Sequence, residues 1–223
     1  MNIWIIMILV MVGSFIVQNT LQRRFHEYSQ IPNDQRLTGA EVARKMLQEH
    51  GIYDVQISCI PGQLTDHYNP QTKTVNLSEG VYSSRSIAAA AIAAHECGHV
   101  VQHATSYAPL QLRTALVPIV SFASKTVQWV LLLGVLLINI TPSLLWLGIA
   151  LFAMSTLFSF VTLPVEINAS HRAIKWLERS DIASRDTAPM AIDALKWAAY
   201  TYVIAAIGSL ATLLYYIGIA NRD

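Results

Sequence analysis

Residues 95–99 read His95-Glu96-Cys97-Gly98-His99, and the rest of the chain is best understood from this segment. Two histidines four positions apart on a helix project from one face, because four residues make slightly more than one turn. At that separation both imidazole rings can hold one Zn²⁺ ion. Glu96 lies about 100° further round the helix, where its carboxylate can reach a water molecule on the metal and accept its proton. The alternative is an alanine-rich core helix with two incidental histidines, because three fixed residues in five also occur by chance.

The composition of the chain predicts an integral membrane protein. Of its 223 residues, 53% are hydrophobic and only 13% are charged. Soluble domains carry about 25% charged residues, so a lipid bilayer is an expected partner. The formal net charge of +1 argues against nucleic acid as a partner.

Apolar segments predict about four transmembrane helices. Residues 1–21 are expected to form an uncleaved anchor, because no lysine or arginine precedes the apolar run and no clear cleavage site follows it. Residues 116–163 contain two spans joined by a tight turn, which predicts a helical hairpin, and residues 197–220 form the fourth span. Lys125, inside the hairpin, is either a functional side chain or one that snorkels to the interface.

Residues 22–115 have the pattern of a water-facing, zincin-like catalytic region. Thr38-Gly39-Ala40-Glu41 is a capping box that opens a helix ending near Gly51. The segments Val55 to Ile60 and Lys73 to Leu77 are expected to be strands. The second is either an ordinary edge strand or one that pairs with an extended substrate.

The metal motif is expected on a helix that begins after Ser83 or Ser84 and continues to His103. Its four alanines at 88–91 predict close packing, and a membrane-spanning helix is the expected neighbour. His103 lies a further turn beyond His99 on the same face, so we expect it to support the metal site from outside.

A catalytic zinc site needs a third protein ligand on the same side of the membrane. Pro164 is expected to end the hairpin, so that residues 164–196 begin a new polar helix. Glu166 is the first ionisable residue there and is therefore a candidate ligand. The loop before the motif offers the competing candidates Asp66, His67 and Glu79.

The distribution of basic residues predicts the orientation. Residues 23–115 and 165–196 hold eight and five of the fifteen lysine and arginine residues. Because cytoplasmic segments carry an excess of basic residues, both segments are expected in the cytoplasm and both termini outside. The chain is therefore expected to be a multi-pass protein of the cell membrane.

Three blocks of sequence resemble a known family. They are DHYNPQTKTVNLSEGVY at 66–82, HECGHVVQH at 95–103 and LPVEINASHRA at 163–173. Together they resemble the membrane zinc metallopeptidases typified by YugP, over nearly the whole chain. More distantly, they are similar to the gluzincins of the HtpX and CAAX prenyl protease class.

This resemblance implies Zn²⁺ as the cofactor, His95, His99 and Glu166 as its ligands, and Glu96 as the general base. Ser170 stands where the gluzincin pattern E-x-x-x-D has its aspartate, so Asn168 or Ser170 is expected to support a ligand histidine.

The implied function is that of a zinc metallopeptidase, a membrane-embedded endopeptidase acting on protein or peptide substrates. Zn²⁺ would activate a bound water, and Glu96 would accept its proton. His171 and Arg172 are candidate donors to the oxyanion. The alternatives are a metal-bound membrane scaffold or adaptor, which would need no base, and a protease with its zinc inside the bilayer. An enzyme of this kind is compatible with membrane partner proteins.

Overall fold

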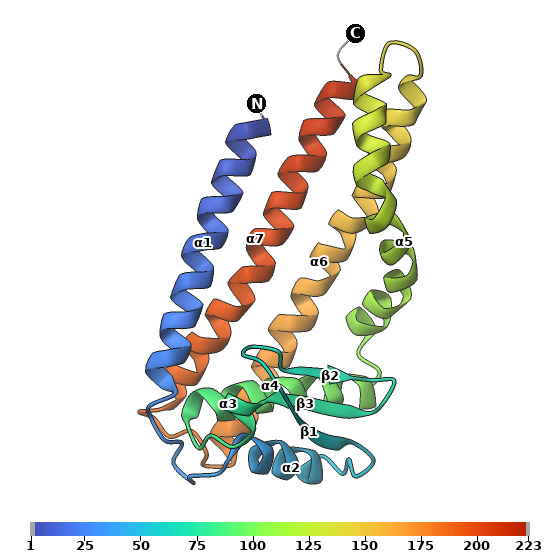
Figure 1. Cartoon of the computed structure of the whole chain (residues 1–223). Coiled ribbons are helices and arrows are strands. Elements are labelled where there is room, and N and C mark those ends of the chain that lie inside the picture. Colours follow the sequence, from blue (N-terminus) through green and yellow to red (C-terminus); the bar gives the residue numbers. More distant parts are fainter. Residues whose placement is uncertain (1–2, 222–223) are drawn as a thin grey trace. The chain divides into compact units, whose positions relative to one another are not determined.

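A computed structural model describes residues 3–221 (Figure 1). The elements are, in chain order, α1 (Ile3–Tyr28), α2 (Gly39–Glu49), β1 (Gln56–Ile60), β2 (His67–Asn69), β3 (Thr74–Ser78), α3 (Glu79–Tyr82), α4 (Ile87–Ala104), α5 (Ala108–Leu136), α6 (Pro142–Arg179) and α7 (Ala188–Ala220). They form two compact units. The hydrophobic unit comprises residues 3–16, 108–164 and 200–221, and the polar unit comprises residues 17–107 and 165–199.

The fold class predicted from the sequence is confirmed: the chain is mainly helical, with a small sheet. Among residues 3–221, four helices have the length and apolar composition needed to cross a membrane, namely α1, α5, α6 and α7. Large apolar side chains are exposed along them, as a lipid-facing surface requires. Examples are Trp4, Leu9, Phe15, Phe122 and Trp129.

Two glycines within the hydrophobic unit allow α5 and α6 to pack closely as a hairpin. A Cβ atom on Gly134 would lie 2.7 Å from the Cα of Leu145, and one on Gly148 would lie 2.8 Å from Cδ2 of Leu131. Glycine therefore permits the two backbones to approach, as small residues commonly do between membrane helices.

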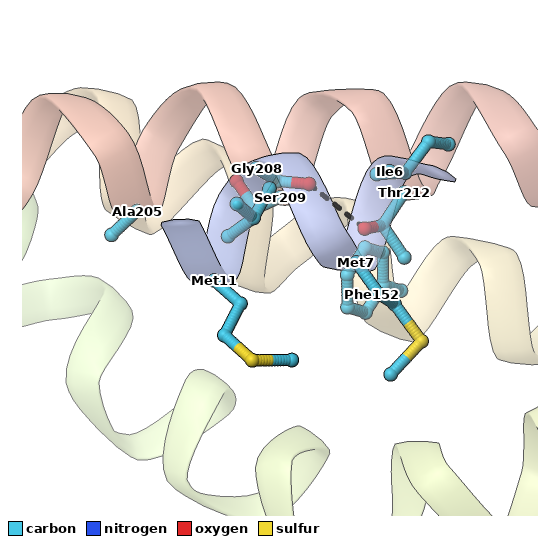
Figure 2. Close-up of a pocket in the computed structure, with 9 residues that line it drawn as sticks. Ile6, Met7, Met11, Phe152, Ala205, Gly208, Ser209 and Thr212 are labelled. Atoms are coloured by element: carbon cyan, nitrogen blue, oxygen red, sulfur yellow. Dashed lines mark hydrogen bonds between the residues drawn. The ribbon is translucent and has the colours of Figure 1, made fainter. Parts of the chain in front are cut away.

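A groove of about 430 Å³ lies in the hydrophobic unit (Figure 2). Its apolar lining comes from α1, α6 and α7, and two hydroxyls in it bond back to their own helix, Ser209 to the carbonyl of Ala206 and Thr212 to that of Gly208. These hydroxyls are already satisfied, so the groove offers mainly apolar contact. Lys125 is exposed on α5 and does not line it.

Pro164 does not end a helix, contrary to the sequence prediction. α6 continues through it from Pro142 to Arg179. An interior proline removes one intrahelical hydrogen bond and costs about 3 kcal/mol, which tertiary packing can offset. The residues that follow are deeply buried: Val165 is 0% and Glu166 3% exposed. The helix is therefore retained by packing that local sequence does not reveal.

The sheet of the polar unit has the order β1-β3-β2, with β1 parallel and β2 antiparallel to β3. β3 is therefore the central strand, and the prediction that it lies at an edge is wrong. The sequence analysis missed β2, a three-residue strand too short for an alternating pattern. Val75 and Leu77 of β3 are fully buried in the main core.

α2 begins with the predicted capping box. The backbone N–H of Glu41 donates to the Thr38 hydroxyl at 3.2 Å, and the backbone N–H of Thr38 donates to the Glu41 carboxylate at 2.8 Å. The four alanines of α4 are fully buried in a core that includes Val42 and Met46 of α2. α4 packs along α2, a helix of the polar unit, and the same core includes Ala173 and Leu177 of α6, one of the helices of membrane-spanning length. The expected long-helix neighbour therefore shares this core with α2.

Candidate metal centre

The metal-motif helix starts at a serine cap. Ser86, rather than the predicted Ser83 or Ser84, is the N-cap of α4, and its hydroxyl accepts the backbone N–H of Ala89 at 3.1 Å. This cap satisfies one of the free N–H groups at the helix start. The regular helix then sets His95 and His99 one turn apart on one face, with their ring centroids 4.8 Å apart.

Gly98 lets α6 approach this face. A Cβ atom at position 98 would lie 2.7 Å from the carbonyl oxygen of Ala169 and 3.1 Å from its Cα. Any other residue would push the two backbones apart. The absence of a side chain at Gly98 therefore allows Glu166, one turn before Ala169, to face the two histidines.

The structure brings His95, His99 and Glu166 into one cluster. The Oε2 atom of Glu166 lies 3.3 Å from Nε2 of His95 and 3.5 Å from Nε2 of His99. One ligand atom from each residue lies within 4.8 Å of the other two, and Glu166 is 3% exposed.

These separations fit a metal ion. Ligand atoms about 2.0–2.2 Å from a tetrahedral Zn²⁺ ion are roughly 3.3–3.5 Å from one another. Direct N–H···O hydrogen bonds are typically shorter, about 2.7–3.2 Å. Two imidazoles and a carboxylate are also a common donor set of catalytic zinc. The cluster could therefore hold a metal ion.

The electrostatics of the cluster favour a cation. Burial by itself lowers the pKa of His99, but the nearby Glu166 carboxylate and the negative charge of Glu96 outweigh this effect. The pKa of His99 consequently lies above its ordinary value. Positive charge is thus stabilised where His99 meets the carboxylates.

The outer nitrogens of both histidines have partners. Nδ1 of His95 lies 3.1 Å from the Ser170 hydroxyl, and Nδ1 of His99 lies 3.1 Å from Oε1 of Gln102. Such bonds leave the Nε2 atoms facing Glu166 and orient the rings. Ser170 thus occupies the supporting position expected of it.

Gln102, which supports His99, was not identified from the sequence. The available signal was its position three residues after His99, which places both side chains on one helix face. His103, which was expected to support the metal site from outside, makes an edge-on ring contact with Tyr68, with the ring centroids 5.5 Å apart.

Glu96 is 8% exposed beside the cluster. Within residues 3–221, no hydrogen bond or ion pair holds its carboxylate. Its carboxylate oxygens therefore remain available as hydrogen-bond acceptors.

The competing ligand candidates lie outside the cluster. Asp66 accepts hydrogen bonds from the backbone N–H and the hydroxyl of Ser78, and burial raises the pKa of its carboxyl. Nδ1 of His67 is bonded to the carbonyl of Thr65, and Glu79 begins α3. In the described part of the chain, only His95, His99 and Glu166 form a group of this kind.

Of the two candidate oxyanion donors, Arg172 is already engaged. Its Nε–H donates to Oδ1 of Asn168 at 2.8 Å, and its guanidinium lies over the ring of Tyr107. His171 is exposed on α6.

The chain is mainly helical and has four helices of membrane-spanning length, and its cluster joins two histidines of α4 to Glu166 of α6. These are the features of a membrane zinc metallopeptidase. The chain belongs to the family described as "Putative neutral zinc metallopeptidase", whose model matches residues 3–221. It is 41% identical over 204 residues to the "Putative membrane protease YugP" of Bacillus subtilis (strain 168), a match that covers 92% of this chain and 90% of the relative. No solved structure matches the chain.

Proposed function

We propose that this chain is a zinc-dependent endopeptidase of the cell membrane, with His95, His99 and Glu166 as the metal ligands and Glu96 as the general base. The observation that carries the proposal is the spacing of the two Nε2 atoms from the Glu166 carboxylate, 3.3 and 3.5 Å. It equals the separation of neighbouring ligands around a tetrahedral ion.

When bound, Zn²⁺ would supply Lewis acidity that polarises a peptide carbonyl and eases deprotonation of water. The protein's own task is then proton transfer and orientation. The Glu96 carboxylate accepts the proton of the attacking water and afterwards delivers it to the nitrogen of the leaving amine. Its freedom from hydrogen bonds and ion pairs within residues 3–221 suits this exchange.

The orientation of the chain in the membrane is also part of the proposal. Segments 23–115 and 165–196 hold thirteen of the fifteen basic residues. They contain most of the polar unit, and the positive-inside rule favours the cytoplasm for them. A site there would act on proteins at the cytoplasmic face of the membrane. The same reasoning favours four spans with both termini outside.

The substitution Glu96→Gln tests the proposal. Glutamine keeps the shape of the side chain but cannot accept the proton. We expect elemental analysis to give about one zinc per chain in the wild type and in Glu96→Gln. Peptidase activity should be lower in the variant by about 10²–10⁴-fold or more. Glu178→Gln, an exposed position on α6, is the matched control and should leave both quantities unchanged.

The variant also identifies the substrate. Membrane proteins that accumulate in cells carrying Glu96→Gln, compared with cells carrying Glu178→Gln, can be measured by mass spectrometry. Activity within a few-fold of the wild type would exclude Glu96 as the base, and a folded preparation without transition metal would exclude a zinc enzyme.

A further inference from the structure

Gln102 joins α4 to α6 behind the metal cluster, and its side chain is fully buried. Its Nε2 donates to the carbonyl oxygen of Val165 at 2.8 Å and to Oδ1 of Asn168 at 3.1 Å. Its Oε1 lies 3.1 Å from Nδ1 of His99. The oxygen and both N–H groups of this amide have partners, as burial requires, because a buried polar group without a partner is destabilising.

The direction of the amide is determined from two sides. A backbone carbonyl only accepts, so the Gln102 atom that faces Val165 must be the NH₂ group. On the other side, Arg172 only donates, and its Nε–H points at Oδ1 of Asn168 from 2.8 Å. That Asn168 atom is therefore an oxygen, which again requires the NH₂ group of Gln102 opposite it.

The remaining atom of the amide, Oε1, can only accept. Nδ1 of His99 must therefore carry a proton, and its Nε2 is left as the atom with a free lone pair. Nε2 lies 3.5 Å from Oε2 of Glu166, which is also an acceptor. Two acceptors facing each other in a buried site need a positive charge between them, as a second proton or as a metal ion.

We propose that Gln102 is a positioning residue for the metal: it holds His99 in its Nδ1–H form, so that Nε2 is the ligand atom. This inference rests on the proposed function, because it assigns a role relative to the proposed zinc site. The contact between Ser170 and His95 differs, because a hydroxyl can donate or accept and so does not determine the form of the ring.

The test measures zinc affinity of the full-length protein in detergent, by competition with a chromogenic chelator. Gln102→Met removes the oxygen that accepts from His99 but keeps a side chain of similar length. It should lower zinc affinity about 10–100-fold, as the loss of a hydrogen bond to a ligand histidine does in zinc sites. Gln102→Glu retains an oxygen toward Nδ1 whether or not it is protonated, and should recover most of that loss.

A third variant separates positioning from packing. Asn168→Ala removes a contact between Gln102 and α6 but leaves Oε1 directed at His99, so zinc affinity should stay within a few-fold of the wild type. Thermal unfolding of each variant without zinc reports on folding alone. If Gln102→Glu binds zinc as weakly as Gln102→Met, or Asn168→Ala loses as much affinity, Gln102 acts through packing and the proposal is wrong.

A measurement on the wild type does not depend on how the variants fold. Nitrogen NMR of the zinc-loaded, ¹⁵N-histidine-labelled protein should show a proton on Nδ1 of His99 and none on Nε2. The reverse assignment would overturn the role of Gln102 while leaving the zinc enzyme intact. A wild-type protein that binds no zinc would instead overturn the proposed function itself, and the metal-directed role of Gln102 with it.

Discussion

The substitution Gly98→Ala tests the approach of α6 to α4 on which the cluster depends. The new Cβ atom would lie 2.7 Å from the carbonyl oxygen of Ala169, whereas ordinary contact begins at 3.4 Å. Because the neighbour is backbone, no side-chain rotation relieves the overlap, and α6 must retreat. Overpacking of this kind costs about 1–3 kcal/mol.

The retreat also has a consequence for the metal. Glu166 lies one turn before Ala169 on the same helix, so its distances of 3.3 and 3.5 Å to the two histidines should lengthen. A ligand set that no longer matches the ion binds it more weakly, and we expect a loss of about tenfold or more in zinc affinity.

The assay is thermal unfolding without zinc together with zinc competition against a chelator. A chain of this size should lose about 2–4 °C in melting temperature per kcal/mol. Gly80→Ala, in α3, is the matched control, because a Cβ atom there meets nothing within 4 Å. The control should be neutral or stabilising by about 0.4–1 kcal/mol. If the two variants have the same melting temperature and zinc affinity, the close approach of α4 and α6 at Gly98 is wrong.

Two further predictions follow from the site and the orientation. Glu166→Ala should lower zinc affinity by about 10–100-fold or more. Glu178→Ala, at an exposed position further along α6, should leave zinc affinity unchanged. If zinc affinity instead falls with Asp66→Ala or His67→Ala and not with Glu166→Ala, the third ligand lies in the upstream loop. A reporter fused after residue 223 should be detected outside the cell, because both basic segments are proposed to be cytoplasmic. A cytoplasmic reporter would contradict the four-span orientation.

The errors of the sequence analysis share one cause. The helix break at Pro164 and the edge position of the strand predicted from Lys73 to Leu77 were each inferred from local pattern. In each case a non-local contact decided otherwise. Val165 and Glu166 are buried directly after Pro164, and β2 pairs with the second edge of β3.

The sequence by itself determined the features that depend on neighbours within a few residues. These include the one-turn separation of His95 and His99, the capping box at Thr38 and the long apolar helices, because helical geometry and hydropathy act locally. Glu166 could be named as a candidate, but Asp66, His67 and Glu79 were chemically equivalent to it as ligand donors.

Only the tertiary structure decided which carboxylate meets the histidines and what holds them. That outcome depends on the close approach of α4 and α6 at Gly98 and on the direction of the Gln102 amide between Val165 and His99. Gln102 and Asn168 are 66 positions apart in the chain. No local pattern specifies such a contact, because the packing of the whole polar unit produces it.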